Sequence, residues 1–294
     1  MWKLRKALMI ASLKYPAAIG IHLIRHNKVA PTVKSEYNIH YGSHRLQCYD
    51  VHTKLETKDL TTIFYIHGGS WISIDKFYYN YIIKSIAEDS YRVVNINYRL
   101  LPKVTLNDVV EDSEKAIKHA LDNIKGINPD KLMIMGDSAG AHLAALIAAK
   151  ANSGTYNFNL KFIACGLFYG LFDMNDMIHG EAFLFKFLTE YFRREVGDTY
   201  EEYLNNVSPS KYYDQNYPPT FLTSGKVDAL NPATMTFIEN LKKSGIKYEA
   251  LIFDENRKDG LHGFLSYTWL DSSKSALKAL LDFFRPIRDG KTNE

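Results

Sequence analysis

Residues 131–149 decide the fold, and they read KLMIMGDSAGAHLAALIAA. The stretch opens with four apolar residues, 132–135, which is typical of a buried strand. It closes with an Ala- and Leu-rich segment, which favours a buried helix. Between them, residues 136–140 form a G-x-S-x-G turn, whose glycines let the backbone reverse and let strand and helix approach each other. We therefore predict a strand–turn–helix unit that presents Ser138 at a helix N-terminus.

Ser138 occupies a position that suits a catalytic nucleophile. A helix N-terminus offers unpaired N–H groups and a partial positive charge, and both stabilise a developing oxyanion. Glycine and serine also occur in strand-to-helix turns that have only a structural role. The role of Ser138 therefore depends on whether the chain supplies a base, an acid and a second oxyanion donor.

Composition narrows the class of protein. A chain of 294 residues with 46% apolar and 23% charged residues suits one large α/β domain or two small ones. The net charge of +3 argues against nucleic acid as the main partner. The chain has only two cysteines, Cys48 and Cys165, which are too few for a disulfide framework. This low cysteine content predicts a cytoplasmic location. No zinc-ligand cluster, P-loop or dinucleotide motif is present, so we expect neither metal nor cofactor.

Residues 1–29 mix basic and apolar side chains. Lys14 interrupts the apolar stretch and no small-residue cleavage site follows, which argues against a signal peptide. No apolar run is long enough to span a bilayer. Two interpretations remain: an amphipathic segment packed over the protein's own active site, or a segment that makes weak contact with a membrane surface or lipid-like substrate.

Strand patterns alternate with helical patterns along the rest of the chain. Two alternating runs on either side of residues 42–43 predict an antiparallel hairpin within residues 35–52. Apolar and β-branched runs predict strands at 61–66, 91–98, 162–169, 220–224 and 248–253. Helical spacing predicts helices at 107–124, 232–243 and 272–284. The fold class is therefore α/β, with a mostly parallel sheet and helices on both faces.

The composition changes between residues 173 and 217. Aromatic and leucine residues recur there as adjacent pairs every four positions, which predicts one helix with a broad apolar face within residues 180–197. We predict that 173–217 is an insertion that forms a helical cap with residues 1–34. The catalytic core is then a single domain of residues 35–172 and 218–294. Trp71, Phe183 and Phe187 are the expected substrate contacts.

A candidate base and acid follow the last strands. His262 lies in a glycine-flanked loop after strand 248–253, at the sheet edge where loops of parallel sheets meet ligands. Asp228 follows strand 220–224 and is the candidate that orients the imidazole. The order Ser138, Asp228, His262 is the nucleophile–acid–base order of α/β-hydrolases. Three carboxylates nearer the histidine are rivals for the acid: Asp254, Glu255 and Asp259.

An oxyanion hole needs backbone N–H groups that no side chain obstructs. The amide of Ala139, next to the nucleophile, is one candidate. Residues 67–71, HGGSW, break the strand 61–66 and supply a glycine turn for the others. His67 itself is expected to shape this loop through a hydrogen bond.

These motifs resemble the hormone-sensitive-lipase-like branch of the α/β-hydrolases, which has an H-G-G-G loop and a G-D-S-A-G elbow. Residues 97–102, NYRLLP, are similar to that family's D-Y-R-L-A-P segment. The resemblance implies the α/β-hydrolase fold, a helical cap, and oxyanion donation by Gly68, Gly69 and Ala139. Two positions depart from the family pattern: Ser70 replaces the third glycine and Asn97 replaces the aspartate.

We predict a serine carboxylesterase that hydrolyses short- to medium-chain acyl esters through an acyl-enzyme. Residues 138–144, SAGAHLA, also resemble arylformamidases, so an amide or formamide hydrolase with the same triad is the alternative. A binding protein that has lost catalysis is the third reading. The expected partner is a small-molecule ester, and homo-oligomerisation stays open.

Overall fold

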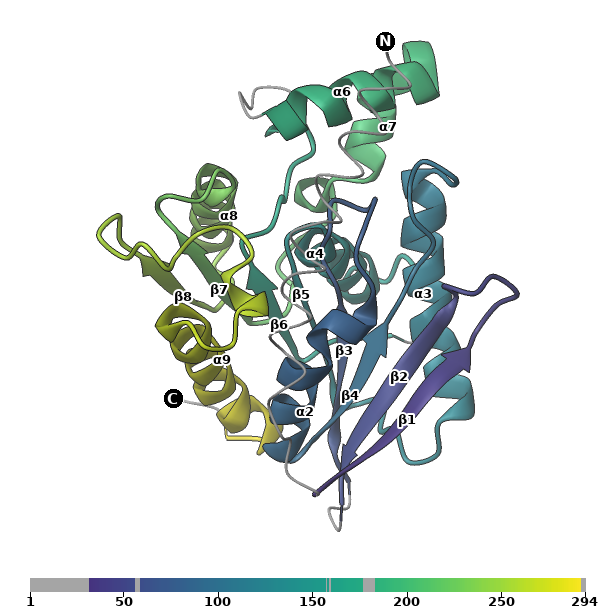
Figure 1. Cartoon of the computed structure of the whole chain (residues 1–294), viewed down its shortest axis with the longest axis vertical. Helices are drawn as coiled ribbons and strands as arrows, with labels where there is room; N and C mark the ends of the chain where they lie inside the picture. The colour runs from purple at the N-terminus through teal and green to yellow at the C-terminus, as the bar shows by residue number, and fades with distance from the viewer. Residues whose placement is uncertain (1–31, 56–58, 157, 159, 177–182, 292–294) are drawn as a thin grey trace.

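The computed structural model describes residues 32–55, 59–156, 158, 160–176 and 183–291 (Figure 1). Its eight strands form one sheet in the order β1-β2-β4-β3-β5-β6-β7-β8. The strands are β1 Val33–His40, β2 Cys48–Lys54, β3 Thr61–Ile66, β4 Tyr91–Ile96, β5 Leu132–Asp137, β6 Ala164–Phe168, β7 Thr220–Gly225 and β8 Tyr248–Phe253. β2 pairs antiparallel with β1 and β4, and every other pairing is parallel. The predicted hairpin and mostly parallel sheet are therefore both present.

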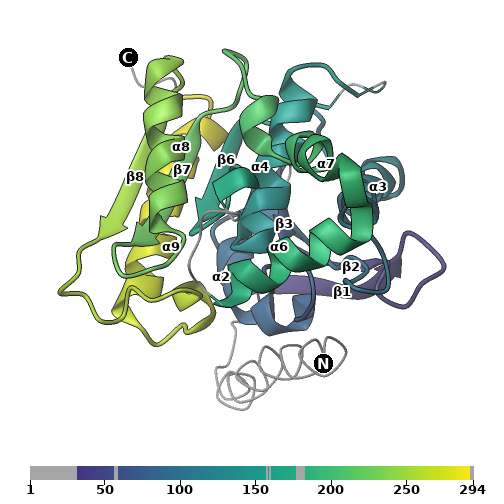
Figure 2. The same cartoon turned by 90° about the horizontal axis from the view of Figure 1, so that it is seen from above.

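Helices cover both faces of the sheet (Figures 1 and 2). One face is covered by α2 Asn80–Glu88 and α9 Asp271–Arg288. The other is covered by α3 Leu106–Asn123, α4 Ala139–Asn152 and α8 Asn231–Lys243. The sequence patterns did not predict α2. It is short, and its adjacent β-branched residues Ile82 and Ile83 fit a strand as readily as a helix.

The central strands bury side chains on both faces. In β3, Ile63 and Tyr65 pack toward α2 and α9, whereas Phe64 and Ile66 pack toward α3 and α4. All four side chains are fully buried. This two-sided burial explains why the strand reads as a continuous apolar and aromatic run rather than as an alternating one.

The segment 173–217 contains two helices, α6 Phe183–Val196 and α7 Tyr200–Asn206, and the short 3-10 helices η2 Gly197–Thr199 and η3 Pro209–Lys211. Figure 1 shows α6 and α7 above one end of the sheet, and Figure 2 shows α6 crossing over that end. α6 matches the predicted helix, and its apolar residues Phe187, Leu188, Tyr191 and Phe192 are buried. Residues 1–31 of the predicted cap lie outside the described residues.

None of the helices in the described ranges is long and apolar enough to cross a bilayer.

Candidate active site

Ser138 lies at a sharp turn between β5 and α4. Its backbone has φ 52° and ψ −120°, a conformation that non-glycine residues rarely adopt. Its N–H donates to the Phe168 carbonyl of β6 at 2.9 Å, which holds the turn against the sheet. A Cβ at Gly140 would overlap the Ile66 carbonyl oxygen, so this glycine is what lets α4 pack directly against the end of β3. The turn therefore projects Ser138 beyond the carboxyl edge of the parallel strands.

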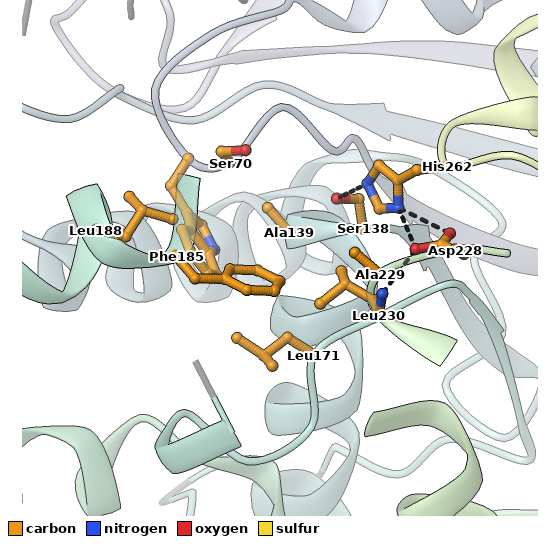
Figure 3. A pocket seen from close by; sticks show the side chains of 11 residues that line it. Ser70, Ser138, Ala139, Leu171, Phe185, Leu188, Asp228, Ala229, Leu230 and His262 are labelled. Atoms are coloured by element: carbon orange, nitrogen blue, oxygen red, sulfur yellow. Dashed lines mark hydrogen bonds and ion pairs between the residues drawn. The ribbon is translucent and has the colours of Figure 1, made fainter. Parts of the chain in front are cut away.

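Ser138, His262 and Asp228 form a continuous hydrogen-bonded chain (Figure 3). Ser138 Oγ lies 2.9 Å from His262 Nε2, and His262 Nδ1 lies 3.1 and 2.9 Å from the two carboxylate oxygens of Asp228. Because a carboxylate can only accept, Nδ1 carries the proton and Nε2 is left to accept from the serine hydroxyl. The structure thus brings together the three residues predicted as nucleophile, base and acid.

Asp228 is buried, with 4% of its surface exposed, whereas the His262 side chain is 44% exposed. One carboxylate oxygen of Asp228 also accepts the Leu230 N–H at 2.8 Å, which fixes the carboxylate after β7. The His262 ring meets the edge of Tyr169, with 5.0 Å between the ring centroids. A buried acid beside an accessible imidazole suits a base that must reach a substrate.

The rival acid Asp259 is engaged elsewhere. It forms an ion pair with Arg257 at 2.9 Å, and its Oδ2 accepts the Ser272 N–H at 2.7 Å. Its backbone carbonyl accepts the Ser272 hydroxyl at 2.6 Å. The Arg257 guanidinium holds the pKa of the Asp259 carboxyl well below its usual range. Asp254 accepts the Asn256 N–H in its own loop. Among the described carboxylates, Asp228 is the one hydrogen-bonded to His262.

Residues 67–75, here named the oxyanion loop after their predicted role, hold one of the predicted donors in another contact. The Gly68 N–H donates to Asp137 Oδ1 at 2.9 Å, so it is not available to a substrate. In the part of the chain that the structure describes, the N–H groups of Gly69, Ser70 and Ala139 have no hydrogen-bond partner. Ser70, which stands where the hormone-sensitive-lipase-like pattern has its third glycine, therefore offers an N–H group that Gly68 does not. This N–H group belongs to the backbone, so it is present whatever side chain residue 70 carries.

The carbonyls of the same loop explain how those amides are oriented. Gly68 O accepts from His67 Nδ1 at 2.7 Å, and Gly69 O accepts from Ser73 N and Ser73 Oγ, both at 3.1 Å. In a trans peptide the C=O of one residue and the N–H of the next point in opposite directions. The partners of these two carbonyls therefore turn the N–H groups of Gly69 and Ser70 to the opposite side of the loop.

His67 makes the loop-shaping hydrogen bond that its position predicts. Its ring is fully buried and stacks on Tyr98 with 4.4 Å between centroids. Burial lowers the pKa of the His67 imidazole, which keeps the ring neutral at ordinary pH. A neutral, buried ring that holds a carbonyl is a structural support rather than a proton carrier.

A cavity of about 220 Å³ opens beside Ser138. Figure 3 shows His262 and Asp228 on one side of Ser138, and Phe185 and Leu188 on the other side, beyond Ala139. Most of the wall is apolar, supplied by Trp71, Ala139, Leu171, Phe185, Leu188, Ala229 and Leu230. The remaining lining residues are polar: Ser70, Ser138, Asp228 and His262. The sequence predicted Trp71 in this wall, but not Leu171, Ala229 or Leu230, which come from loops after different strands.

One predicted substrate contact, Phe187, lies outside the lining of this cavity. Phe187 is not among the residues that line it and instead packs in the core with 7% exposure. Phe185 and Leu188 line the cavity because residues three apart share a helix face, and Phe187 projects from another part of α6. Phe183 is the first residue of α6, and its side chain lies outside the described residues.

The described residues contain no group of three or more His, Cys, Asp or Glu side chains arranged to hold a metal ion. Cys48 and Cys165 are both buried and unpaired.

The family model BD-FAE matches residues 49–238. The chain belongs to the BD-FAE family. The match to BD-FAE includes the oxyanion loop, Ser138 and Asp228, and it ends before His262.

Curated relatives of this BD-FAE chain align with part of it. Esterase LipQ of Mycobacterium tuberculosis is 29% identical over 179 residues, which is 58% of this chain and 42% of LipQ. Arylacetamide deacetylase of Bos taurus is 43% identical over 101 residues, which is 32% of this chain and 25% of that protein. The chain spans about half the length of the curated relatives it matches, and less for the deacetylase.

Solved structures of other proteins are similar to this fold over nearly the whole chain. Esterase B of Lactobacillus rhamnosis (HN001) superposes with a TM-score of 0.85 at 21% identity, over 98% of this chain and 97% of that one. A further structure of esterase B, inhibited by a C4-C4 SN3 tributyrin phosphonate, gives a TM-score of 0.83. The predicted α/β-hydrolase fold is confirmed.

Proposed function

We propose that this chain is a serine hydrolase that cleaves carboxylic esters with short- to medium-chain acyl groups. The observation that carries the proposal is the hydrogen-bonded chain Ser138–His262–Asp228 beside an apolar cavity. Membership of the BD-FAE family and similarity to proteins named esterases support it.

In the proposed mechanism, Ser138 Oγ attacks the ester carbonyl carbon while His262 Nε2 takes the hydroxyl proton. Asp228 stabilises the imidazolium that forms. His262 then returns the proton to the departing alkoxide, which leaves as the alcohol, and Ser138 keeps the acyl group. In the second half, His262 takes a proton from water, the hydroxide attacks the acyl-enzyme, and the proton returns to Ser138 as the carboxylic acid is released.

The negative charge of each tetrahedral intermediate needs stabilisation. The N–H groups of Gly69, Ser70 and Ala139, which have no partner among the described residues, are the proposed donors, and Ala139 adds the positive end of the α4 dipole. Loss of one oxyanion-hole donor typically costs about 10²–10³ in kcat. We therefore expect disruption of the loop that carries Gly69 and Ser70 to lower kcat almost as much as loss of a triad residue.

The wall of the cavity suits an uncharged acyl group. Among the described side chains, its wall beyond Ser138 offers no cation that could hold a carboxylate or phosphate. Burial of each methylene of the acyl chain there contributes about 0.8 kcal/mol to binding. Its volume of about 220 Å³ is smaller than the roughly 300–1,000 Å³ of pockets for drug-sized ligands. A short or medium chain suits this space. Because Phe185 and Leu188 close it, we propose that residues 173–217 act as a cap, with residues 1–34 as its second part.

The test is hydrolysis of p-nitrophenyl esters from acetyl to decanoyl, with Ser138→Ala measured alongside. We expect serine-dependent turnover that peaks at a short or medium chain. Turnover that persists in Ser138→Ala would contradict the triad, and a peak at decanoyl would contradict the proposed chain length.

An amide hydrolase that uses the same triad is a second candidate. Its support is the 43% identity, over 101 residues, to arylacetamide deacetylase. The two activities differ in the leaving group, because an amine must be protonated before it departs. Comparison of p-nitrophenyl acetate with p-nitroacetanilide and N-formylaniline separates them: an ester-to-amide ratio of kcat/KM below one would favour the amide hydrolase.

A further inference from the structure

Asp137 is a buried carboxylate that the proposed proton transfers do not use. It is the last residue of β5, directly before the nucleophile, and only 2% of it is exposed. Tyr65 donates to its Oδ1 at 2.7 Å, and Tyr79 donates to its Oδ2 at 2.8 Å. The Gly68 N–H is the third donor, at 2.9 Å to Oδ1. The carboxylate thus connects the nucleophile turn to the oxyanion loop.

A carboxylate in this position is costly to the fold. Burial disfavours its ionised form and raises the pKa of Asp137, and the described residues give it no cationic partner. Its three donors are all neutral groups, and their hydrogen bonds lower the pKa of Asp137 and so favour the ionised form against the effect of burial. Hydrogen bonds to a charged acceptor are shorter and stronger than those between neutral groups. The carboxylate therefore holds the Gly68 N–H more firmly than a neutral acceptor would.

The hydrogen bond to Gly68 determines how the next peptide is oriented. Asp137 holds the Gly68 N–H, and His67 Nδ1 holds the Gly68 carbonyl. With both backbone groups held, Gly68 cannot rotate, and the Gly69 N–H that follows is fixed opposite the Gly68 carbonyl. A Cβ at Gly68 would lie 2.7 Å from Asp137 Oδ2, which shows how closely the loop and the carboxylate are packed.

We propose that Asp137 is a positioning residue that orients the oxyanion donors, with Tyr65 and Tyr79 fixing its carboxylate. The inference rests on the proposed ester hydrolysis and concerns only the stabilisation of the tetrahedral intermediate. Asp137 itself touches neither the substrate nor the transferred proton. Its removal should therefore weaken binding of the transition state while leaving binding of the ester ground state almost unchanged.

The experiment compares Asp137→Ala, Asp137→Asn and the wild type with p-nitrophenyl butyrate and with an alkyl trifluoromethyl ketone. The ketone forms a hemiketal whose oxyanion occupies the same position as that of the intermediate. For Asp137→Ala we expect kcat to fall about 10²-fold, the size of one lost oxyanion donor, and the ketone Ki to rise by a similar factor. KM should change less than about threefold. Asp137→Asn keeps one acceptor oxygen for Gly68 and should recover part of the loss.

Asp112→Asn is the matched control. Asp112 is also a fully buried carboxylate, but its hydrogen-bond donors are Gln47 and Arg99, neither of which belongs to the oxyanion loop. This variant should lower the melting temperature without changing the ratio of ketone Ki to ester KM. If Asp137→Ala fails to fold, Tyr65→Phe and Tyr79→Phe give the same readout, with smaller increases in ketone Ki.

An Asp137→Ala protein with unchanged kcat and ketone Ki would overturn the inference, as would equal losses in KM and ketone affinity. Those results require an active wild type, so they leave the proposed function in place. A wild type without serine-dependent turnover would instead overturn the proposed function, and this inference with it.

Discussion

Asn97 and Asp75 form a matched pair at the carboxyl end of the oxyanion loop. Asn97 Nδ2 donates to Asp75 Oδ2 at 2.8 Å, and Asn97 Oδ1 accepts the Lys76 N–H at 2.7 Å. An aspartate at position 97, as in the hormone-sensitive-lipase-like pattern, could accept but not donate. The asparagine is therefore required by its neighbour Asp75, and the departure from the family pattern has a local chemical reason.

Asn97→Asp should give the enzyme a new pH dependence. Two carboxylates at hydrogen-bonding distance cannot both ionise without repulsion, so one must hold a proton. Three further groups face this pair: the neutral His67, the Cys48 thiol, and Lys76, which forms an ion pair with Asp50. We expect kcat/KM of the variant, relative to the wild type, to fall roughly tenfold between pH 5 and 9, since one pKa unit of coupling corresponds to a factor of ten. The double variant Asp75→Asn/Asn97→Asp restores a donor and an acceptor and should be close to wild type. A flat ratio, or a double variant no better than the single one, contradicts the pairing.

Gly69→Ala should affect kcat more strongly than it affects the free energy of unfolding. Gly69 has φ +108°, and a Cβ there would overlap the Ser73 carbonyl oxygen, so the loop must shift. We expect kcat to fall at least about 10²-fold through loss of an oxyanion donor. Gly245→Ala is the control, because Gly245 also has a positive φ (+66°) but has open space around it. It should cost about 1 kcal/mol of stability and leave kcat unchanged. Equal kcat in the two variants would contradict the role of Gly69.

Phe185→Leu should shift the acyl preference toward longer chains. Phe185 lines the cavity, and a smaller side chain leaves room for more of the acyl group. Each further methylene accommodated contributes about 0.8 kcal/mol, or about fourfold in kcat/KM. Phe187→Leu is the matched control, since Phe187 is in the same helix but not in the cavity wall. It should lower stability without changing the ratio of octanoyl to butyryl hydrolysis. An identical shift in both variants would mean that the effect comes from the stability of the proposed cap and not from the cavity wall.

The stability of the protein should fall in mild acid because of His142. This fully buried histidine hydrogen-bonds the Val207 carbonyl through Nε2, and burial lowers its pKa to about 4. In the unfolded chain its pKa is about 6.5, so the unfolded state binds the proton first as the pH falls. The stabilisation is complete above about pH 6.5 and is lost progressively toward pH 4. His142 alone should make unfolding about 2 kcal/mol easier at pH 5 than at pH 7.

Urea unfolding at the two pH values measures this difference. In His142→Gln the fall between pH 7 and pH 5 should be smaller by about that amount. His40→Gln, at an exposed position of β1, should keep the wild-type fall. The same pH dependence in all three proteins would show that His142 is not the responsible group.

The parts of the site that lie in local motifs could be predicted from the sequence. Ser138 follows from one contiguous turn, and Asp228 and His262 follow from their positions after predicted strands. The contact of the Gly68 N–H could not be predicted, because its direction is set by Asp137, which belongs to another strand. A glycine in a motif shows that an amide can approach a ligand but not which way it points.

The substrate wall could be predicted only in part for a similar reason. The spacing of aromatic residues identified α6, yet whether Phe185 or Phe187 faces the cavity depends on how the helix docks on the core. α7 was not predicted, since its seven residues are too few for a periodic pattern to stand out. Such features depend on tertiary packing, which local sequence does not encode.

The most direct test of the central claim is covalent labelling with a p-nitrophenyl alkylphosphonate, followed by intact-mass measurement and peptide mapping. The proposed mechanism predicts one adduct per chain, located on Ser138, with ester hydrolysis lost in proportion to labelling. Ser138→Ala should take up no label and hydrolyse no ester. An adduct at another residue, or full ester hydrolysis by Ser138→Ala, would contradict the assignment of Ser138 as the nucleophile.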